Sequence, residues 1–137
     1  MAPTLILTAV EHLPWVTPGD DLVPLVIAAT ASQGLVPEPG DILVVAQTVV
    51  SKAEDRMVAL AAVSPSTVAV KLAEETGKDA RLVELILSES TAIVRSRPGL
   101  IIAEHRCGHV LANASIDASN IAQDDGEQVL LWPEDPD

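Results

Sequence analysis

The sequence has almost no aromatic side chains: among 137 residues there is no Phe or Tyr, and there are only two Trp. A hydrophobic core must therefore be built from Val, Leu, Ile and Ala. Hydrophobic residues are nevertheless plentiful, at 48% of the chain, and this fraction excludes a disordered polypeptide. The length suits one domain, so residues 1–137 are expected to form a single domain.

Cysteine and long apolar runs are also scarce. The single cysteine cannot form an internal disulfide, which fits a reducing cytoplasm. No apolar run approaches the roughly 20 residues that a membrane-spanning helix needs. The first residues lack a basic region ahead of an apolar stretch, so they do not form a secretory signal. We therefore expect a cytoplasmic protein with no membrane partner.

Basic residues are few: eight Lys and Arg stand against 20 Asp and Glu, for a formal net charge of −12. Nucleic acid is not an expected partner, because phosphate backbones need Lys and Arg. A bound nucleotide would need divalent metal and local cations to offset this field, which favours Mg²⁺ or Mn²⁺ at any nucleotide site. The acidity also has a plainer explanation as a solvated surface, since net charge governs solubility more than individual sites.

The most informative stretch is residues 113–120, which reads Asn-Ala-Ser-Ile-Asp-Ala-Ser-Asn and follows β-type sequence. Large side chains are absent, so a ligand could approach the backbone closely. Asp117 could hold a hard cation, and Asn113 and Asn120 could hydrogen-bond a nucleotide. The alternative is a turn-rich loop, because Asn, Asp and Ser favour turns through local hydrogen bonds. Taken alone, this stretch favours the loop.

A second segment, residues 41–54, begins with a continuous run of mostly β-branched apolar residues, which is typical of a buried strand. Gln47 and Thr48 end this run, and Lys52 follows shortly afterwards. Open α/β sheets often place ligand contacts just past the end of a buried strand, and an ammonium group suits phosphate. The alternative is a surface lysine, which is the usual environment of this residue.

The whole pattern predicts an α+β fold, with a mixed sheet and helices. Helices are expected to begin near Asp21, at Ser64-Pro65 and at Asp79, and the first two to end at Gly34 and Gly77. The expected strands are residues 4–10, 42–46, 92–94, 100–104, 110–111 and 129–131.

Residues 105–109, His-Arg-Cys-Gly-His, suggest zinc, but a zinc site needs about four ligands in a tetrahedral array. A turn around Gly108 explains this stretch better, with the two histidines on either side of it. Cys107 has no activating partner that the sequence can assign, so the sequence gives no basis for a nucleophile.

Read in order, several segments resemble the coenzyme F-420-0:γ-glutamyl ligase family, and the resemblance covers residues 4–137. No single segment is decisive, but their order and spacing together are specific. The resemblance implies the N-terminal lobe of the ligase fold, and family members continue for about as many residues again. The segments are residues 13–16 with 19–22, residues 40–54, residues 78–90, residues 113–120 and residues 130–137.

The resemblance implies an amide-forming ligase. GTP would phosphorylate the carboxylate of the deazaflavin precursor of coenzyme F-420, and the amine of L-glutamate would displace phosphate from the acyl phosphate. Asp117 would ligate Mg²⁺ or Mn²⁺, a monovalent cation is a further candidate, and no catalytic residue is assigned. The residues that the resemblance places around the guanine nucleotide are Leu13, Pro14, Trp15, Val16, Gln47, Thr48, Lys52 (on phosphate) and Asn120.

The sequence departs from the family pattern in two ways. The family has glycine where this chain has His12, Asp55 and Ser115, and glycine usually marks positive φ or close backbone approach, so Ser115 could crowd a ligand. Family members also carry further metal-binding positions beyond the segment corresponding to Asp137. The resemblance implies a homodimer. It leaves open a separate chain that supplies the C-terminal half, or a non-catalytic half that serves as a nucleotide-binding or assembly module.

Overall fold

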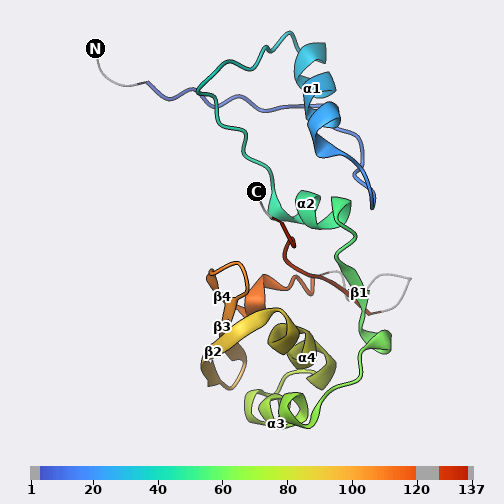
Figure 1. The fold of residues 1–137 in the computed structure, drawn as a ribbon, viewed down its shortest axis with the longest axis vertical. Helices are drawn as coiled ribbons and strands as arrows, with labels where there is room; N and C mark the ends of the chain where they lie inside the picture. The colour runs from blue at the N-terminus through green and yellow to red at the C-terminus, as the bar shows by residue number, and fades with distance from the viewer. Residues whose placement is uncertain (1–3, 120–126, 136–137) are drawn as a thin grey trace.

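The structure is a computed structural model that describes residues 4–119 and 127–135 (Figure 1). Helices and short strands follow one another along these residues. In chain order the elements are α1 Leu22–Ser32, α2 Gln47–Ala53, β1 Met57–Ala59, η1 Leu60–Ala62, α3 Thr67–Thr76, α4 Ala80–Ser88, β2 Ser90–Arg97, β3 Leu100–His105, β4 Val110–Ala112, η2 Asn113–Ser115 and β5 Gln128–Leu130.

Two small antiparallel sheets organise the second part of the chain. One has the order β2-β3-β4, and in the other β1 pairs with β5, so that Met57 lies opposite Leu130. The expected α+β class is confirmed. The strand pairs of the described residues are all antiparallel, so the sheet that we expected to be mixed is instead two antiparallel sheets.

The hydrophobic core lies where α3 and α4 cover β3. Val83 and Ile86 of α4 and Ile101 and Ala103 of β3 are fully buried. Buried and half-buried residues alternate along β3, as the two-residue period of a strand requires. The core cluster is built only of Ala, Val, Leu and Ile, which confirms the expectation drawn from the missing aromatics.

Helix ends follow local signals. The Asp21 and Asp79 side chains cap α1 and α4 by accepting from the backbone N–H two residues later, and Gly34 and Gly77 adopt the left-handed conformation expected of residues that end a helix. The cap expected at Ser64-Pro65 is wrong by two residues. Ser66 caps α3, and its Oγ accepts from the backbone N–H of Ala69 at 3.2 Å.

Two expected strands do not form. Residues 4–10 and 42–46 have no β-ladder in the described structure, and most of their side chains are exposed. A strand requires a hydrogen-bonded neighbour, and none of the described residues forms one beside these segments. The chain becomes helical at Gln47, so Lys52 lies within α2 and not in a loop after a strand.

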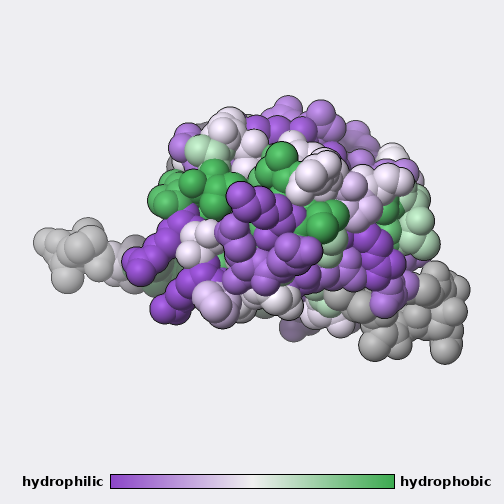
Figure 2. All heavy atoms as spheres, turned by 90° about the horizontal axis from the view of Figure 1, so that it is seen from below, coloured by the Kyte–Doolittle hydropathy of each residue, from purple (hydrophilic) through white to green (hydrophobic). Residues whose placement is uncertain are grey.

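The end of the molecule formed by α3 has a mostly hydrophilic surface (Figure 2). Figure 2 looks from below onto the end formed by α3, where hydrophilic side chains separate small hydrophobic patches. Helix α1 lies at the opposite end in Figure 1. Within residues 4–119 and 127–135, no helix is long and apolar enough to cross a membrane.

Candidate functional site

Helix α2 carries three of the expected nucleotide contacts. Thr48 and Lys52 are four residues apart and therefore lie on one face of the helix. Gln47 donates through Nε2 to Ser51 Oγ at 2.6 Å, while the same nitrogen lies 3.5 Å from the backbone oxygen of Leu131. The second contact is long for a hydrogen bond, but it places the start of α2 against the residue that follows β5.

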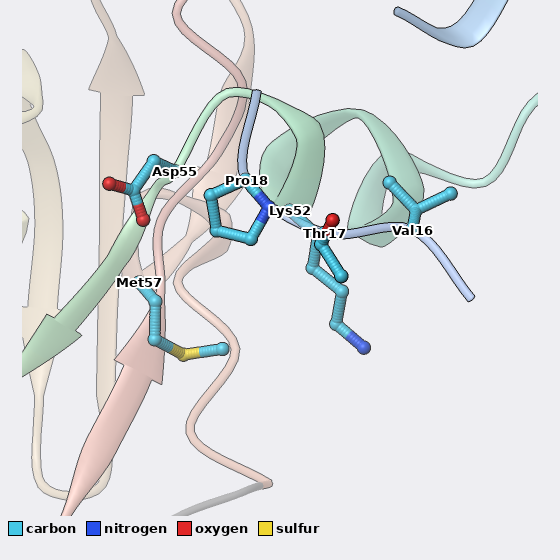
Figure 3. A pocket seen from close by; sticks show the side chains of 6 residues that line it. All are labelled: Val16, Thr17, Pro18, Lys52, Asp55 and Met57. Atoms are coloured by element: carbon cyan, nitrogen blue, oxygen red, sulfur yellow. The ribbon is translucent and has the colours of Figure 1, made fainter. Parts of the chain in front are cut away.

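The Lys52 side chain lines a pocket of about 230 Å³. Its other walls come from the segment before α1 and from the chain that leaves α2 (Figure 3). In Figure 3 the Lys52 ammonium points away from the Asp55 carboxylate. The lining residues are Val16, Thr17, Pro18, Lys52, Asp55 and Met57.

The pocket is smaller than typical ligand sites, which span roughly 300–1,000 Å³. It can therefore hold part of a nucleotide, such as a phosphate, but not a whole one. Lys52 forms no ion pair with any described residue, so its charge remains available to a ligand. The backbone N–H of Gly19 donates to the Ala53 carbonyl at 2.8 Å and fixes this wall against α2.

The expected guanine loop is only partly assembled. Val16 is half-buried and lines the pocket beside Lys52. Leu13 and Pro14 are exposed, and the Trp15 side chain is 94% exposed. The structure thus brings one of the four loop residues to the lysine and leaves the other three in solvent.

Asp117 pairs with β5 through its backbone, on the edge of β5 opposite β1. Its backbone N–H and carbonyl form a two-way bridge with Leu130, with both hydrogen bonds at 2.9 Å. One carboxylate oxygen accepts from the backbone N–H of Ser119 at 2.8 Å. Hydrogen bonds with Ser119, and then the positive charge of Lys52, hold the pKa of Asp117 below its ordinary value. Asp117 is therefore ionised at neutral pH and within the field of Lys52.

A left-handed turn carries the chain into Asp117. Asn113, Ala114 and Ser115 have φ values of 53°, 50° and 58°, which side-chain-bearing residues rarely adopt in succession. Their conformation turns the chain sharply between β4 and the bridge to Leu130. Ala114 is fully buried at the centre of this turn, and the buried Oδ1 of Asn113 has no hydrogen-bond partner among the described residues.

The three positions at which the family resemblance expects glycine share this backbone feature. His12, Asp55 and Ser115 have φ values of 60°, 56° and 58°. Glycine adopts such angles without steric strain, whereas residues with a Cβ atom are strained there. The glycine pattern of the family thus coincides with left-handed backbone at all three positions of this chain.

A metal ion fits this site only in part. Asp117 offers an ionised carboxylate, the kind of oxygen ligand that Mg²⁺ and Mn²⁺ prefer. Yet no group of three or more His, Cys, Asp or Glu residues that could hold a metal is found in the described ranges. The remaining ligands would have to come from a nucleotide, from water or from further polypeptide. Asn120, an expected nucleotide contact, lies outside the described residues.

The histidine-cysteine stretch is built into the β3–β4 turn. His105 is fully buried, and its Nδ1 accepts from the backbone N–H of Cys107 at 3.2 Å. Its Nε2 lies 3.4 Å from the Glu89 carboxylate. Because Nδ1 accepts, the proton sits on Nε2, and neither nitrogen is directed to solvent.

The sequence did not indicate three of the residues that line the pocket. Thr17, Pro18 and Met57 line the pocket but belong to no recognisable chemical motif. The Pro18-Gly19 pair is a turn signal that predicts a turn here but not its contact with α2. Met57 could not have been found, since it reaches the pocket only through the pairing of β1 with β5.

Within the described residues, an α+β scaffold holds a lysine without an ion-pair partner at a small pocket, with an ionised aspartate within its field. This arrangement defines a candidate phosphate-binding and metal-binding site. The family model described as F420-0:Gamma-glutamyl ligase matches residues 11–137. The chain therefore belongs to the F420-0:γ-glutamyl ligase family.

Curated relatives carry the name coenzyme F420:L-glutamate ligase. The protein of Methanothermobacter thermautotrophicus is 47% identical over 131 residues, which are 96% of this chain and 51% of the relative. That of Methanopyrus kandleri is 48% identical over 135 residues, 98% of this chain and 50% of the relative. That of Halobacterium salinarum is 40% identical over 134 residues, 93% of this chain and 49% of the relative. The chain thus spans about half the length of these relatives.

Proposed function

We propose that this chain forms the nucleotide-binding half of a GTP-dependent ligase that joins L-glutamate to the deazaflavin precursor of coenzyme F420. The observation that carries the proposal is the free ammonium of Lys52 at a pocket, within electrostatic reach of ionised Asp117. Family membership and the names of the relatives support the ligase chemistry.

In the proposed reaction a carboxylate oxygen of the precursor attacks the γ-phosphorus of GTP. The bond to the bridging oxygen breaks, and GDP leaves with its electron pair. The glutamate amine then attacks the acyl carbon, the bond to phosphate breaks, and the amine nitrogen loses a proton. The chain's own contribution is to position these groups and to balance charge, as in other phosphoryl transfers.

Lys52 would bind a phosphate through a charge-assisted hydrogen bond, because its ammonium pairs with no side chain of the described residues. Asp117 would hold Mg²⁺ or Mn²⁺, which when bound neutralises phosphate charge. Val16 and the exposed Trp15 would close on the guanine base. Thr48 shares a helical face with Lys52 and would contact the same nucleotide.

Calorimetry of GTP with the whole chain, with and without Mn²⁺, tests this proposal. We expect Mn²⁺ to tighten GTP binding, and Asp117→Asn to remove most of that gain. Glu74→Gln is the matched control, because it removes one negative charge from the exposed surface of α3 and should leave the gain intact. Equal GTP affinity with and without metal, or an equal effect of both variants, would contradict the assignment.

A second candidate is a module that binds nucleotide or assists assembly without turning over alone. The observation in its favour is that Asp117 has no partner carboxylates for a metal centre in the described residues, whereas two-metal phosphate chemistry needs several ligands. A glutamylation assay on the purified chain separates the two candidates. Steady GTP turnover with glutamate addition supports the complete ligase, and GTP binding without turnover supports the module.

A further inference from the structure

Residues 4–46 have almost no core of their own. The main hydrophobic cluster is drawn from Leu60 to Leu131, and none of its buried members lies before Leu60. Within residues 4–46, only Ala29 and Thr30 of α1 are buried. In Figure 1 this part of the chain arches away from the two sheets and joins them through α2.

Two segments of this region have the pattern of buried strands but pair with no strand in the described part of the chain. Residues 5–7 and 42–45 are apolar without alternation, so apolar side chains point to both faces, as in a strand covered on both sides. Yet Ile6 is 81% exposed and Val44 86% exposed. The backbone N–H and carbonyl groups of these segments have no partner among residues 4–119 and 127–135, and unpaired strands of this kind bind further strands readily.

Helix α1 is likewise apolar but largely exposed. Its first eight residues are all apolar, which gives it hydrophobic side chains on every face. A helix of this kind is normally buried on all sides, but Val23 and Ile27 are 65% and 58% exposed. The two strand-like segments and α1 together form one continuous stretch of chain, which we call the uncovered region, residues 4–46.

The charge of the uncovered region restricts what can cover it. It contains no Lys or Arg, and its acidic residues are Glu11, Asp20, Asp21, Glu38 and Asp41. A second copy docked through the same surface would place like charges against one another, which is unfavourable. The homodimer that the family resemblance implies would therefore use a different surface.

The lengths of the relatives indicate which polypeptide packs on the uncovered region. Each is about twice as long as its match to this chain, and the Methanopyrus kandleri match takes in 98% of this chain. We propose that the uncovered region is the docking surface for the polypeptide that forms the other half of these ligases, and that this polypeptide adds strands beside residues 5–7 and 42–45. The proposal rests on family membership and not on the proposed nucleotide chemistry.

Titration of the whole chain with the portion of the Methanopyrus kandleri ligase that lies outside the match tests this proposal. We expect a one-to-one complex by analytical ultracentrifugation. Val44→Asp and Ile6→Asp should each weaken it at least about tenfold, because a charge on a buried strand blocks its packing. Val68→Asp is the matched control: Val68 is also exposed, at 65%, but it lies on α3, and this variant should bind within about twofold of the parent.

A second measurement covers the case in which that portion does not fold alone. The two polypeptides are joined in one chain, and amide hydrogen exchange is compared with that of the isolated 137-residue chain. Amides of residues 5–7 and 42–45 should exchange at least about tenfold more slowly in the joined chain. No complex together with no protection would overturn the proposal, as would equal weakening by Val68→Asp. If the 137-residue chain self-associates and Val44→Asp abolishes that association, a second copy of the chain occupies the surface instead.

Both experiments omit GTP, glutamate and the deazaflavin precursor. A stable complex that does not bind GTP would therefore count against the proposed function alone. Metal-dependent GTP binding without any complex would count against the docking surface alone.

Discussion

Arg56 and Glu89 form a largely buried ion pair between two parts of the chain that are 33 residues apart, with Nη2 and Oε2 separated by 2.5 Å. Arg56 precedes β1, and Glu89 caps the end of α4 immediately before β2. Arg56 also donates through Nε to the Trp132 carbonyl, and Arg106 approaches the same Glu89 oxygen at 3.2 Å. The pair thus joins the β1–β5 sheet to the β2–β3–β4 sheet.

Glu89→Gln is expected to destabilise the fold strongly. The substitution leaves the guanidinium of Arg56 with only the exposed and more distant Glu134 carboxylate, 4.0 Å away, as a counter-charge. Breaking a buried pair typically costs about 3–5 kcal/mol. Urea unfolding followed by circular dichroism measures the loss. Arg81→Ala is the control, because the Arg81 ion pairs with Asp79 and Glu127 are solvent-exposed and should contribute far less. Similar losses for both variants would show that Glu89 has no special role between the sheets.

Lys52→Ala should weaken GTP binding by about 1.5–3 kcal/mol, the range for a hydrogen bond to a charged group. Lys71→Ala and Lys78→Ala remove the same charge from α3 and from the loop that follows it, and should bind GTP almost as the parent does. Calorimetry at fixed salt concentration gives all three affinities. Equal losses at the three positions would point to the overall field of the protein and not to a phosphate contact.

Ser115→Gly should stabilise the protein by about 1 kcal/mol, since it relieves a left-handed residue with φ of 58°. Ser88→Gly provides the opposite control. Ser88 lies in α4, where glycine lowers stability by roughly 0.5–1 kcal/mol. Thermal unfolding of both variants shows whether the same chemical change has opposite signs at the two positions. A destabilised Ser115→Gly would indicate that the serine side chain makes a contact worth more than the relieved strain.

Stability should fall as the pH drops below 6.5. Burial holds the pKa of His105 below 6.5 despite its hydrogen bond with Glu89, and the charges of Arg106 and Arg56 lower it further. His105 therefore takes up a proton near pH 6.5 in the unfolded chain but stays neutral at that pH in the folded protein. The free energy of unfolding accordingly decreases as the pH falls below about 6.5. A proton on Nδ1 would also break the hydrogen bond that this nitrogen accepts from the backbone N–H of Cys107.

Denaturant midpoints measured between pH 8 and 5 check the His105 prediction. His105→Gln should flatten the dependence between about pH 6.5 and 5, whatever its effect on absolute stability. His109→Gln should retain the dependence of the parent, since His109 lies on the exposed side of the same turn. An unchanged slope in His105→Gln would assign the dependence to other groups.

Local features of this chain could be predicted from the sequence because their causes are local. Asp21 and Asp79 cap helices through bonds within two residues, and Gly34 and Gly77 turn the chain where it needs positive φ. The glycine positions of the family likewise indicated either positive φ or close backbone approach at Ser115, and the backbone there is left-handed. The cap at Ser66 was missed by two residues because Ser64-Pro65 offers an equally good signal.

Long-range features could not be predicted in this way. Val49 and Val50 favour a strand, yet their segment is helical, because no neighbouring strand competes with local hydrogen bonds. The pocket brings Val16 to Lys52 through the Gly19–Ala53 contact, which no periodicity reveals. The approach of Arg56 to Glu89 depends on how β1 meets β5 and has no signature in either segment.

The two tryptophans give the protein a pair of separate optical reporters. With no tyrosine in the chain, near-ultraviolet absorption and intrinsic fluorescence arise from Trp15 and Trp132. Trp15 projects into water from the loop before the pocket, whereas Trp132 packs near His105 and His109, with ring centroids 6.3 Å and 6.1 Å away. A ligand that closes the loop would shift the emission of the first indole, and loosening of the β3–β4 turn would alter that of the second. Replacing either residue alone by leucine would let one signal be followed without the other.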